Sequence, residues 1–263
     1  MYEFDYHRAT SLDDAASRLG DVDAKLVAGG MTLIPTLKMR LAKPSQLVDL
    51  GAIPALKGIS EDGNAIVIGA MTRHAEVNRS AVVKRAIPAL AALAGMIGDP
   101  AVRNRGTIGR SIANNDPAAD YPAAVVALNA VVRTNKREIA ADSFFTGLFE
   151  TALGEGEIVT GVRFAKPQAA NYQKFKNPAS RYAIVGVFVA RSAAGVRVAV
   201  TGAGPCVFRV PAMEAALARS FTADAIKDIQ IPQDGLNSDI HASAEYRAHL
   251  VNVMARRAVA ACG

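Results

Sequence analysis

Two consecutive glycines, Gly29 and Gly30, separate a short apolar run from the start of a helix. Residues 25–28 have the length and composition of a buried strand. Residues 32–38 resume as a helix, in which Pro35 is tolerated because it lies in the first turn. Glycine permits the positive φ angles and the close backbone approach that such a junction requires. Unpaired backbone N–H groups then surround one point, which suits a phosphate, although a plain turn between strand and helix has the same pattern.

A second segment, residues 106–121, is dense in side-chain oxygen donors and acceptors. Its polar residues are Thr107, Ser111, Asn114, Asn115, Asp116 and Asp120, and they stand beside Gly109, Ile108 and Ile112. Polar density beside apolar anchors suits a buried diphosphate and ribose better than a solvent loop. The alternative is an Asx-type turn that caps the next helix, which Asp116-Pro117 fits.

Apolar runs and turn residues divide the 263-residue chain into three units. Residues 1–56 form a βαβ-like unit whose first helix begins near Thr10-Ser11. The second unit, residues 57–167, is expected to have strands at 65–70, 130–134 and 157–164. Its expected helices are one capped by Thr72 and two at 87–97 and 121–128, with a loop at 98–120. In a connecting helix, a small aromatic cluster is expected from Phe144, Phe145 and Phe149. After a hinge at 167–169, an α+β unit has strands near 182–191 and 195–201 and helices near 211–219, 222–228 and 242–260.

Together the two glycine-bearing segments resemble the FAD-binding medium subunit of the xanthine dehydrogenase and aerobic carbon monoxide dehydrogenase family, the molybdenum hydroxylases. In that family an AGGxxL(I)P-type segment and a TIGG(S/N)IAN…PAAD segment hold the flavin nucleotide. The matching residues here are 28–35, 107–114 and 117–120, and the likeness extends to 157–159, Lys176, 180–183 and 243–247. It therefore covers essentially the whole chain, with its specificity in the two segments.

The resemblance implies an α+β fold with an FAD-binding domain of the vanillyl-alcohol-oxidase/PCMH-like type at residues 1–167. This domain has two subdomains, about 1–56 and 57–167, and a smaller α+β C-terminal domain follows at residues 168–263. The implied cofactor-binding residues are Leu26, Val27, Ala28, Gly29, Gly30, Met31, Thr32, Leu33, Thr107, Ile108, Gly109, Arg110, Ser111, Asn114, Asp120, Ile158, Val159, Lys176 and Tyr182.

The resemblance also implies a role for each part of this site. The backbone of residues 26–33 would wrap the diphosphate, and Thr107 and Gly109 would contact phosphate or flavin from the other side. Asp120 would accept hydrogen bonds from nucleotide hydroxyls. Of the remaining residues, Ile158 or Val159 would line the adenine or flavin pocket, Lys176 would place a positive charge near the cofactor, and Tyr182 would shield the isoalloxazine ring.

Arg110 departs from the family pattern, which usually has a second glycine at this position. If the backbone φ there is positive, arginine costs roughly 1–2 kcal/mol, and its bulk obstructs the phosphate. The alternative is that the guanidinium pairs with the diphosphate. We expect FAD to bind in either case, more weakly if the side chain obstructs.

The sequence lacks the motifs of several other kinds of cofactor, metal and catalytic site. There is no GxGxxG fingerprint and no GxxxxGK[ST] P-loop. His7, His74, His241 and His249 lack metal-ligand spacing, and each is expected at the surface or at a helix cap. Two cysteines cannot hold an iron–sulfur cluster through four thiolates. No catalytic or metal-binding residue is therefore predicted, and FAD is the expected redox cofactor.

The resemblance implies two partners, a small [2Fe–2S] subunit that delivers electrons and a large molybdopterin subunit that oxidises the substrate. Electrons would leave FAD for an external acceptor such as NAD, a quinone or oxygen. Two alternatives stay open: a self-sufficient FAD-dependent reductase of the same broad fold, such as an enolpyruvyl-sugar reductase, and a cofactor-free assembly module. The first needs a catalytic acid, which the sequence does not reveal, and the second is supported by Arg110.

The net charge of +6 comes from scattered basic residues, so no nucleic-acid partner is expected. Only Arg103, Arg105 and Arg110 gather beside a glycine-containing loop, where they suit an anion. The amino terminus lacks the apolar run of a secretory signal. The longest apolar stretch, 122–132, falls far short of the roughly 20 residues that span a bilayer. We therefore expect a cytoplasmic protein without a membrane span.

Overall fold

A three-stranded parallel sheet forms one end of the molecule in the computed structural model, which describes residues 1–21 and 23–262. Its strands, in the order β1-β3-β2, are β1 (Asp5–Arg8), β2 (Lys25–Val27) and β3 (Gln46–Asp49). Helix α1 (Leu12–Arg18) begins after Ser11, whose Oγ accepts a hydrogen bond from the backbone N–H of Asp14 at 3.1 Å. Helix α2 (Leu33–Lys38) follows the glycine turn and carries Pro35 in its first turn. Parallel strands joined through helices confirm the βαβ-like unit.

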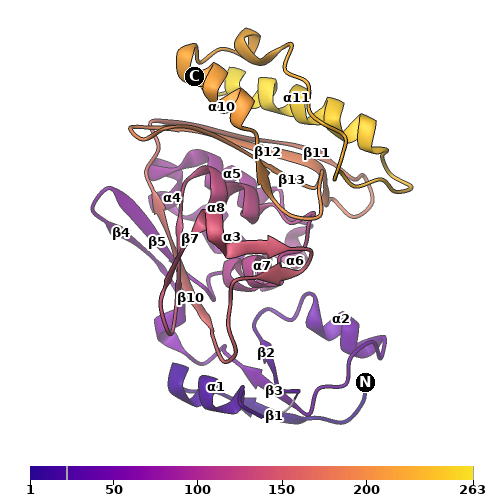
Figure 1. Ribbon diagram of the computed structural model, residues 1–263. Helices are drawn as coiled ribbons and strands as arrows, with labels where there is room; N and C mark the ends of the chain where they lie inside the picture. The colour runs from indigo at the N-terminus through magenta and orange to yellow at the C-terminus, as the bar shows by residue number, and fades with distance from the viewer. Residues whose placement is uncertain (22, 263) are drawn as a thin grey trace.

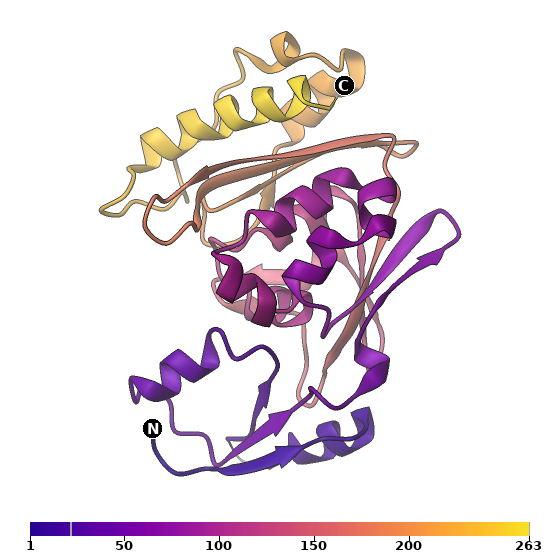
Figure 2. The same cartoon turned by 180° about the vertical axis from the view of Figure 1, so that it is seen from behind.

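A five-stranded antiparallel sheet forms the second unit, with strand β10 at its centre. In the order β4-β5-β10-β6-β7, its strands are β4 (Ile59–Asp62), β5 (Ala65–Gly69), β10 (Val159–Ala165), β6 (Val131–Thr134) and β7 (Glu138–Ala140). Its helices are α3 (His74–Arg79), α4 (Ala81–Ala86), α5 (Pro88–Gly95), α6 (Pro100–Arg105), α7 (Ile108–Asn114) and α8 (Tyr121–Ala127). Figure 2 shows these helices gathered on one side of the sheet. Short connecting elements are the 3-10 helix η1 (Pro54–Leu56), helix α9 (Ala141–Phe144) and the hairpin of β8 (Phe145–Gly147) and β9 (Glu150–Thr151).

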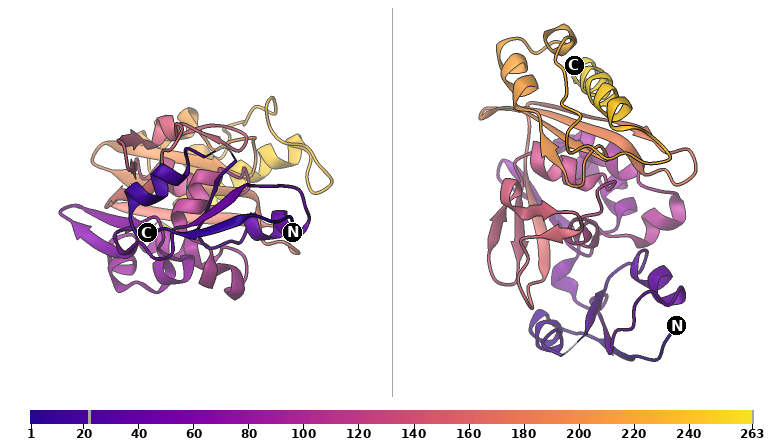
Figure 3. Two further views of the ribbon diagram at one scale, coloured as in Figure 1. Left: turned by 90° about the horizontal axis from the view of Figure 1, so that it is seen from below. Right: turned by 45° about the vertical axis from the view of Figure 1, so that its right-hand side comes forward.

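A four-stranded antiparallel sheet forms the third unit. Its strands, in sheet order, are β11 (Ala169–Lys176), β12 (Ala183–Ser192), β13 (Gly195–Thr201) and β14 (Phe208–Arg209). Helices α10 (Pro211–Arg219) and α11 (Ala244–Ala260) cover its outer face, and α5 and α8 pack against its inner face (Figure 1). The 3-10 helix η2 (Ala223–Ile226) packs against α10 and α11. This sheet and the amino-terminal unit lie at opposite ends of the molecule (Figure 3).

The hydrophobic core of the second unit continues into the third. Tyr172, Phe188 and Ala199 of the four-stranded sheet belong to the same buried cluster as Phe164 of β10. All four side chains are at most 3% exposed. The inner face of the third unit is therefore a wall of the second unit's core, and the predicted boundary between residues 167 and 168 stays a prediction about separate domains.

Several local predictions were wrong. Residues 98–120 do not form one loop, because α6 and α7 lie within them. Thr72 does not cap α3; its hydroxyl bonds the backbone of Gly58, and the backbone N–H of Arg73 is bonded by Glu76 at 2.7 Å.

Other predictions about the aromatic cluster, the strands and one helix were wrong or incomplete. Phe144 and Phe145 contact each other edge to face at 5.0 Å, but Phe149 is 57% exposed and lies outside that cluster. Strands β1 and β11 were not predicted, and the helix expected near 222–228 is the 3-10 turn η2. Within 1–21 and 23–262, no helix combines the length and apolar character needed to cross a bilayer.

Candidate cofactor-binding cleft

A cleft of about 290 Å³ opens where the three units meet. The first unit contributes the turn from Gly29 to Thr32, and the second contributes one face of α7 with the residues around it. The third contributes the loop from Ser180 to Tyr182. The two glycine-bearing segments identified in the sequence therefore face one another across one space.

The two glycine-bearing segments are in direct backbone contact. A Cβ added to Gly29 would lie 2.0 Å from the carbonyl oxygen of Arg105 and 3.0 Å from the Cα of Gly106. Both obstacles are backbone atoms, so no side-chain rotation relieves the clash. Gly30 has a φ of 75°, in the left-handed region that favours glycine. Gly29 is thus required because the backbones of the two segments approach closely, and Gly30 is required because the turn needs a positive φ.

Helix α7 presents its polar side chains to the cleft and its apolar side chains to the core. Thr107, Arg110, Ser111 and Asn114 line the cleft, following the three-to-four-residue spacing of one helix face. Ile108, Gly109 and Ile112 are buried on the opposite side.

Gly109 contacts the core rather than the cleft. Its backbone N–H donates to the carbonyl of Ala70 at 2.9 Å, and an added Cβ would lie 2.5 Å from the Cβ of Ala70. The glycine is therefore required where α7 packs against the segment after β5. Its predicted contact with phosphate or flavin has no support in this placement and stays a prediction.

Arg110 places a guanidinium in the cleft. It lies inside α7 and is not among the residues with positive φ, so the predicted backbone strain is absent. Within the described part of the chain its guanidinium makes no hydrogen bond or ion pair, and burial lowers its pKa from the ordinary value. A partly buried charge without a protein partner suits an anionic ligand.

The other two arginines expected to bind an anion are placed differently. Arg103 donates to the carbonyl oxygens of Ile97 and Gly98 at 2.9 and 2.8 Å. Arg105 is exposed and its side chain does not line the cleft. Of the predicted trio, only Arg110 presents a free charge to the cleft.

Among residues 1–21 and 23–262, two buried polar atoms of cleft-lining residues have no hydrogen-bond partner. They are the hydroxyl oxygen of Thr107 and Nδ1 of His74, whose residues are 3% and 4% exposed. Burial, and secondarily the charge of Arg103, lowers the pKa of His74 to about 4, so the ring is neutral at physiological pH. Buried polar atoms without a partner carry a large desolvation cost. A ligand in the cleft that bonds them removes that cost.

His74 was predicted at the surface or at a helix cap, and this was wrong. Its ring lies 5.4 Å from that of Tyr121, and a Cβ on Gly106 would meet its Nε2 at 2.6 Å. An isolated bridge between Arg73 and Thr107 brings His74 beside the second segment. That pairing joins distant parts of the chain, so no local sequence signal reveals it.

Asp120 lines the cleft with both carboxylate oxygens already bonded. The Tyr172 hydroxyl donates to Oδ1 at 2.6 Å, and the Lys174 ammonium donates to Oδ2 at 2.9 Å. Burial raises the pKa of Asp120, and the Lys174 ammonium and the Tyr172 hydroxyl oppose that shift. The predicted acceptor of nucleotide hydroxyls is therefore held by two side chains of the third unit.

Lys174, which was not predicted as a site residue, bonds the cleft-lining Asp120. A β-bulge between Phe175 and Lys176 shifts the ladder with β12, and Lys176 is exposed. Lys176 does not line the cleft, and its contact with the cofactor stays a prediction. Sequence reasoning missed Lys174 because strand β11 was not predicted and its contact with Asp120 joins residues far apart in the chain.

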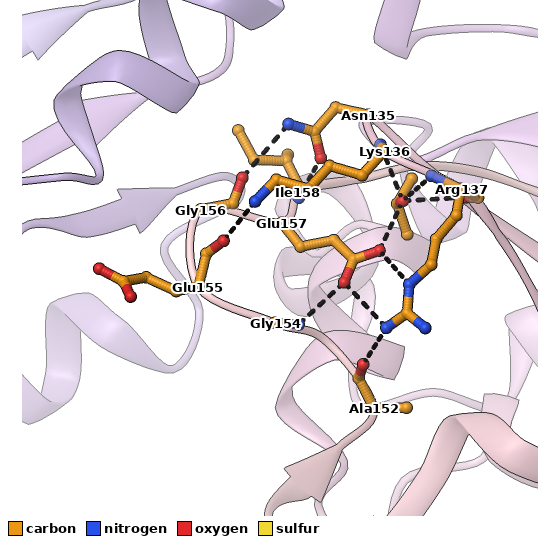
Figure 4. Close-up of polar contacts among 10 residues, drawn as sticks. Asn135, Lys136, Arg137, Ala152, Gly154, Glu155, Gly156, Glu157 and Ile158 are labelled. Atoms are coloured by element: carbon orange, nitrogen blue, oxygen red, sulfur yellow. Dashed lines mark hydrogen bonds and ion pairs between the residues drawn. The ribbon is translucent and has the colours of Figure 1, made fainter.

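Ile158 and Val159 are core residues, 1% and 6% exposed. Figure 4 shows how the loop before them is fixed. The backbone N–H of Ile158 donates to the side-chain oxygen of Asn135 at 2.7 Å, and the same amide donates back to Gly156 at 3.2 Å. These bonds fix the backbone at Gly156 and Ile158. Neither Ile158 nor Val159 lines the cleft, so their role at the cofactor stays a prediction.

The remaining predicted residues divide between the cleft and its support. Met31, Ser111, Asn114 and Tyr182 line the cleft. Tyr182 is 49% exposed, as an aromatic side chain at a cleft entrance would be. The supporting residues are Leu26, Val27 and Ala28 at the end of β2, Leu33 at the start of α2 and Ile108 in the core.

Residues 2–167 match the protein family described as the FAD binding domain in molybdopterin dehydrogenase. The chain belongs to this family. The carbon monoxide dehydrogenase medium chain of Hydrogenophaga pseudoflava is 36% identical, over 97% of this chain and 96% of the relative. The nicotine 6-hydroxylase medium subunit of Paenarthrobacter nicotinovorans is 37% identical, over 98% and 96%.

Solved structures agree with the sequence relatives. A carbon monoxide dehydrogenase from Hydrogenophaga pseudoflava that lacks the Mo-pyranopterin moiety superimposes with a TM-score of 0.90 at 37% identity, covering 99% of this chain and 97% of that one. This confirms the predicted α+β fold. The chain is a flavoprotein, an FAD-binding subunit of a molybdenum-hydroxylase-type oxidoreductase.

The cleft fits the negatively charged dinucleotide that this family binds. The Gly29–Gly30 turn leaves room for close backbone approach, and Arg110 offers an unpaired positive charge. Thr107 offers an unpartnered buried hydroxyl. No group of three or more His, Cys, Asp or Glu in 1–21 and 23–262 is arranged to hold a metal ion.

Proposed function

We propose that FAD lies with its diphosphate between the Gly29–Thr32 turn and the polar face of α7, and that the chain carries electrons between protein partners and an external acceptor. The proposal is carried by the contact of the two glycine-bearing segments beside the unpaired guanidinium of Arg110. Backbone N–H groups at a turn and a guanidinium together match a diphosphate in charge and geometry.

In this arrangement each part of the site has one task. The backbone of residues 26–33 follows the diphosphate, Thr107 donates its hydroxyl, and Arg110 pairs with a phosphate oxygen. Asp120 accepts a hydrogen bond from a nucleotide hydroxyl and Tyr182 shields the ring system at the entrance. When bound, FAD supplies both one- and two-electron chemistry, which lets a protein connect single-electron donors with two-electron acceptors.

The relatives are named medium chains or medium subunits, which supports assembly with other subunits. We propose a small [2Fe–2S] subunit as the electron donor and a large molybdopterin subunit as the site of substrate oxidation. NAD, a quinone or oxygen is the terminal acceptor, and the cytoplasm is the compartment. With two cysteines the chain cannot itself hold an iron–sulfur cluster through four thiolates, so in this proposal the clusters belong to the partner.

FAD titration of Gly29→Val and Gly154→Ala chains tests the placement. A side chain at 29 meets backbone 2.0 Å away, whereas a Cβ at 154 meets only ordinary contact, 3.5 Å from Glu157. We expect at least about tenfold weaker FAD binding for Gly29→Val, or about 1.4 kcal/mol, and no change for Gly154→Ala. Full FAD affinity in a folded Gly29→Val chain would place the cofactor elsewhere.

Copurification tests the electron-transfer part. The tagged chain, isolated from its native host, should bring two further polypeptides together with iron, molybdenum and FAD. Substrate added to that complex should bleach the flavin absorption, and acceptor should restore it. Turnover of NAD(P)H and an organic substrate by the isolated chain would instead support a self-sufficient reductase.

A further inference from the structure

The segment from Asp116 to Asp120, which forms one wall of the cleft, is held mainly by the third unit. The Thr201 hydroxyl donates to the carbonyl oxygens of Pro117 and Ala119 at 3.0 and 2.6 Å. The backbone N–H of Gly202 also donates to Pro117, at 2.8 Å. Strand β13 and the residue after it therefore fix the backbone that leads to Asp120.

Strand β11 fixes the Asp120 side chain itself. Lys174 and Asp120 form an ion pair whose side chains are 2% and 5% exposed, and Tyr172 donates to the same carboxylate. The Lys174 ammonium makes a further hydrogen bond to the carbonyl of Met96 at 3.3 Å, beside the end of α5. Lys174 thus joins the third unit to two segments of the second.

The ion pair determines the net charge at one point of the cleft wall, Asp120. With Lys174 present, a buried carboxylate that faces the cleft is neutralised and fixed in orientation. Without Lys174, the carboxylate either stays charged and repels an anionic ligand, or takes up a proton and loses its role as an acceptor. Either change acts on the ligand through Asp120.

We infer that Lys174 is a positioning residue of the cofactor site, through which the third unit neutralises and orients Asp120 for FAD. This inference rests on the proposed placement of FAD in the cleft. It gives the third unit, which lies outside the 2–167 family match, a second part in cofactor binding besides that of Tyr182.

A double-mutant cycle in the full chain tests the inference, with FAD dissociation constants for the parent, Lys174→Met, Asp120→Asn and the double variant. We expect Lys174→Met to weaken FAD binding at least about tenfold in the parent and less than about twofold in the Asp120→Asn background. An equal loss in both backgrounds would show a merely structural role and overturn the inference.

A pH profile gives a second readout that a structural role would not move. In Lys174→Met, FAD affinity should fall as pH rises, because the unpaired carboxylate ionises and repels the diphosphate. The other charged or titratable groups around Asp120 are Tyr172, Tyr121, Tyr182, His74, Asp116, Arg110 and Arg181. They are unchanged in the double variant, whose affinity should not vary with pH. A flat profile for the single variant would contradict the inference.

Two further variants keep the test decisive. If Lys174→Met does not fold, Tyr172→Phe removes one hydrogen bond to the same carboxylate and leaves the ion pair intact. Its effect on FAD should likewise vanish in the Asp120→Asn background. Arg197→Met is the matched control, because Arg197 also pairs across the two units, with Asp142, but away from the cleft. It should leave FAD affinity unchanged within about twofold.

Different experimental outcomes would refute the role of Lys174 and the placement of FAD. If Gly29→Val retains full FAD affinity, the placement fails whatever the cycle shows. If Gly29→Val loses FAD while the Lys174 and Asp120 effects are additive, the placement stands and only the role of Lys174 is lost.

Discussion

Gly186 of β12 lies so close to Tyr172 of β11 that a Cβ at position 186 would come 2.2 Å from the tyrosine hydroxyl. Gly186 is paired with Lys174 across the β11–β12 ladder. The glycine therefore leaves the space in which the Tyr172 hydroxyl reaches Asp120. A position in the third unit thus controls a hydrogen bond at the wall of the cleft.

Gly186→Ala should displace the Tyr172 ring and break its hydrogen bond to Asp120. Because a hydrogen bond to a charged group contributes about 1.5–3 kcal/mol, we expect a loss of that size in the free energy of unfolding. Urea denaturation measures it. In a Tyr172→Phe background the same alanine should cost clearly less, since the hydroxyl is gone. An equal cost in both backgrounds would mean that the main obstacles are the ring carbon Cζ of residue 172, 2.9 Å from the added Cβ, and the methyl group of Thr201, at 3.0 Å.

His74 should make stability pH dependent. Its folded-state pKa is about 4, below the ordinary value of 6.5, because burial disfavours the charged ring. The unfolded chain therefore binds more protons between these values, and stability falls as pH drops from about 6.5 to about 4. The loss attributable to this residue is at most about 3 kcal/mol. In His74→Phe this part of the pH dependence should disappear, whereas the exposed His249→Phe should retain it. Unfolding free energies at several pH values decide between them.

Local signals in the sequence were sufficient for helix α1, for the turn at 29–30 and for singling out the two segments that meet at the cleft, but not for strand β1. Two glycines after an apolar run indicated the turn at 29–30, and a hydroxyl residue before acids indicated the start of α1 at Ser11. These features depend on residues within one turn of each other, so the sequence displays them directly. The contact between the segments was an expectation from resemblance, and the geometry at Gly29 confirms it.

The parts that could not be predicted depend on long-range packing. Helix α7 has seven residues, and its polar face is turned to a cleft rather than to solvent, so its sequence has the composition of a loop. His74 reaches the cleft through a bridge between Arg73 and Thr107. Lys174 lies in strand β11, which was not predicted, and bonds Asp120 from 54 residues along the chain. None of these has a signal within its own segment.

Arg110→Ala should weaken FAD binding rather than strengthen it. The residue lies in regular helix, so glycine or alanine relieves no strain there, and its unpaired guanidinium faces the cleft. A charge-assisted hydrogen bond contributes about 1.5–3 kcal/mol, which corresponds to a loss of roughly 10- to 100-fold in affinity. The loss should shrink as salt concentration rises.

Arg105→Ala, which removes an exposed arginine on the neighbouring helix, is the control and should change affinity less than about twofold. Tighter binding by Arg110→Ala would show that the side chain obstructs the cofactor.

Glu157 should stabilise the loop before Ile158 at neutral pH but not in strong acid. Its side chain is 2% exposed and accepts hydrogen bonds from the Arg137 guanidinium at 3.0 and 3.1 Å (Figure 4). The hydrogen bond from Arg137, with smaller contributions from Gly154 and Thr134, lowers the pKa of Glu157 to about 2 against the opposing effect of burial. Because the folded-state pKa is depressed, the stabilisation is complete above the ordinary value of 4.5 and is lost as pH falls toward 2.

Glu157→Gln tests this account, because it keeps the shape of the side chain and removes its charge. At pH 7 we expect the variant to lose about 1.5–3 kcal/mol of unfolding free energy, and the gap from the parent should close between about pH 4.5 and 2. Glu138→Gln is the control, since Glu138 pairs with Arg133 through a side chain that is 60% exposed. An exposed ion pair contributes at most about 1 kcal/mol, so this variant should unfold almost like the parent. A gap for Glu157→Gln that stays constant down to pH 2 would show that the carboxylate's charge does not stabilise the loop.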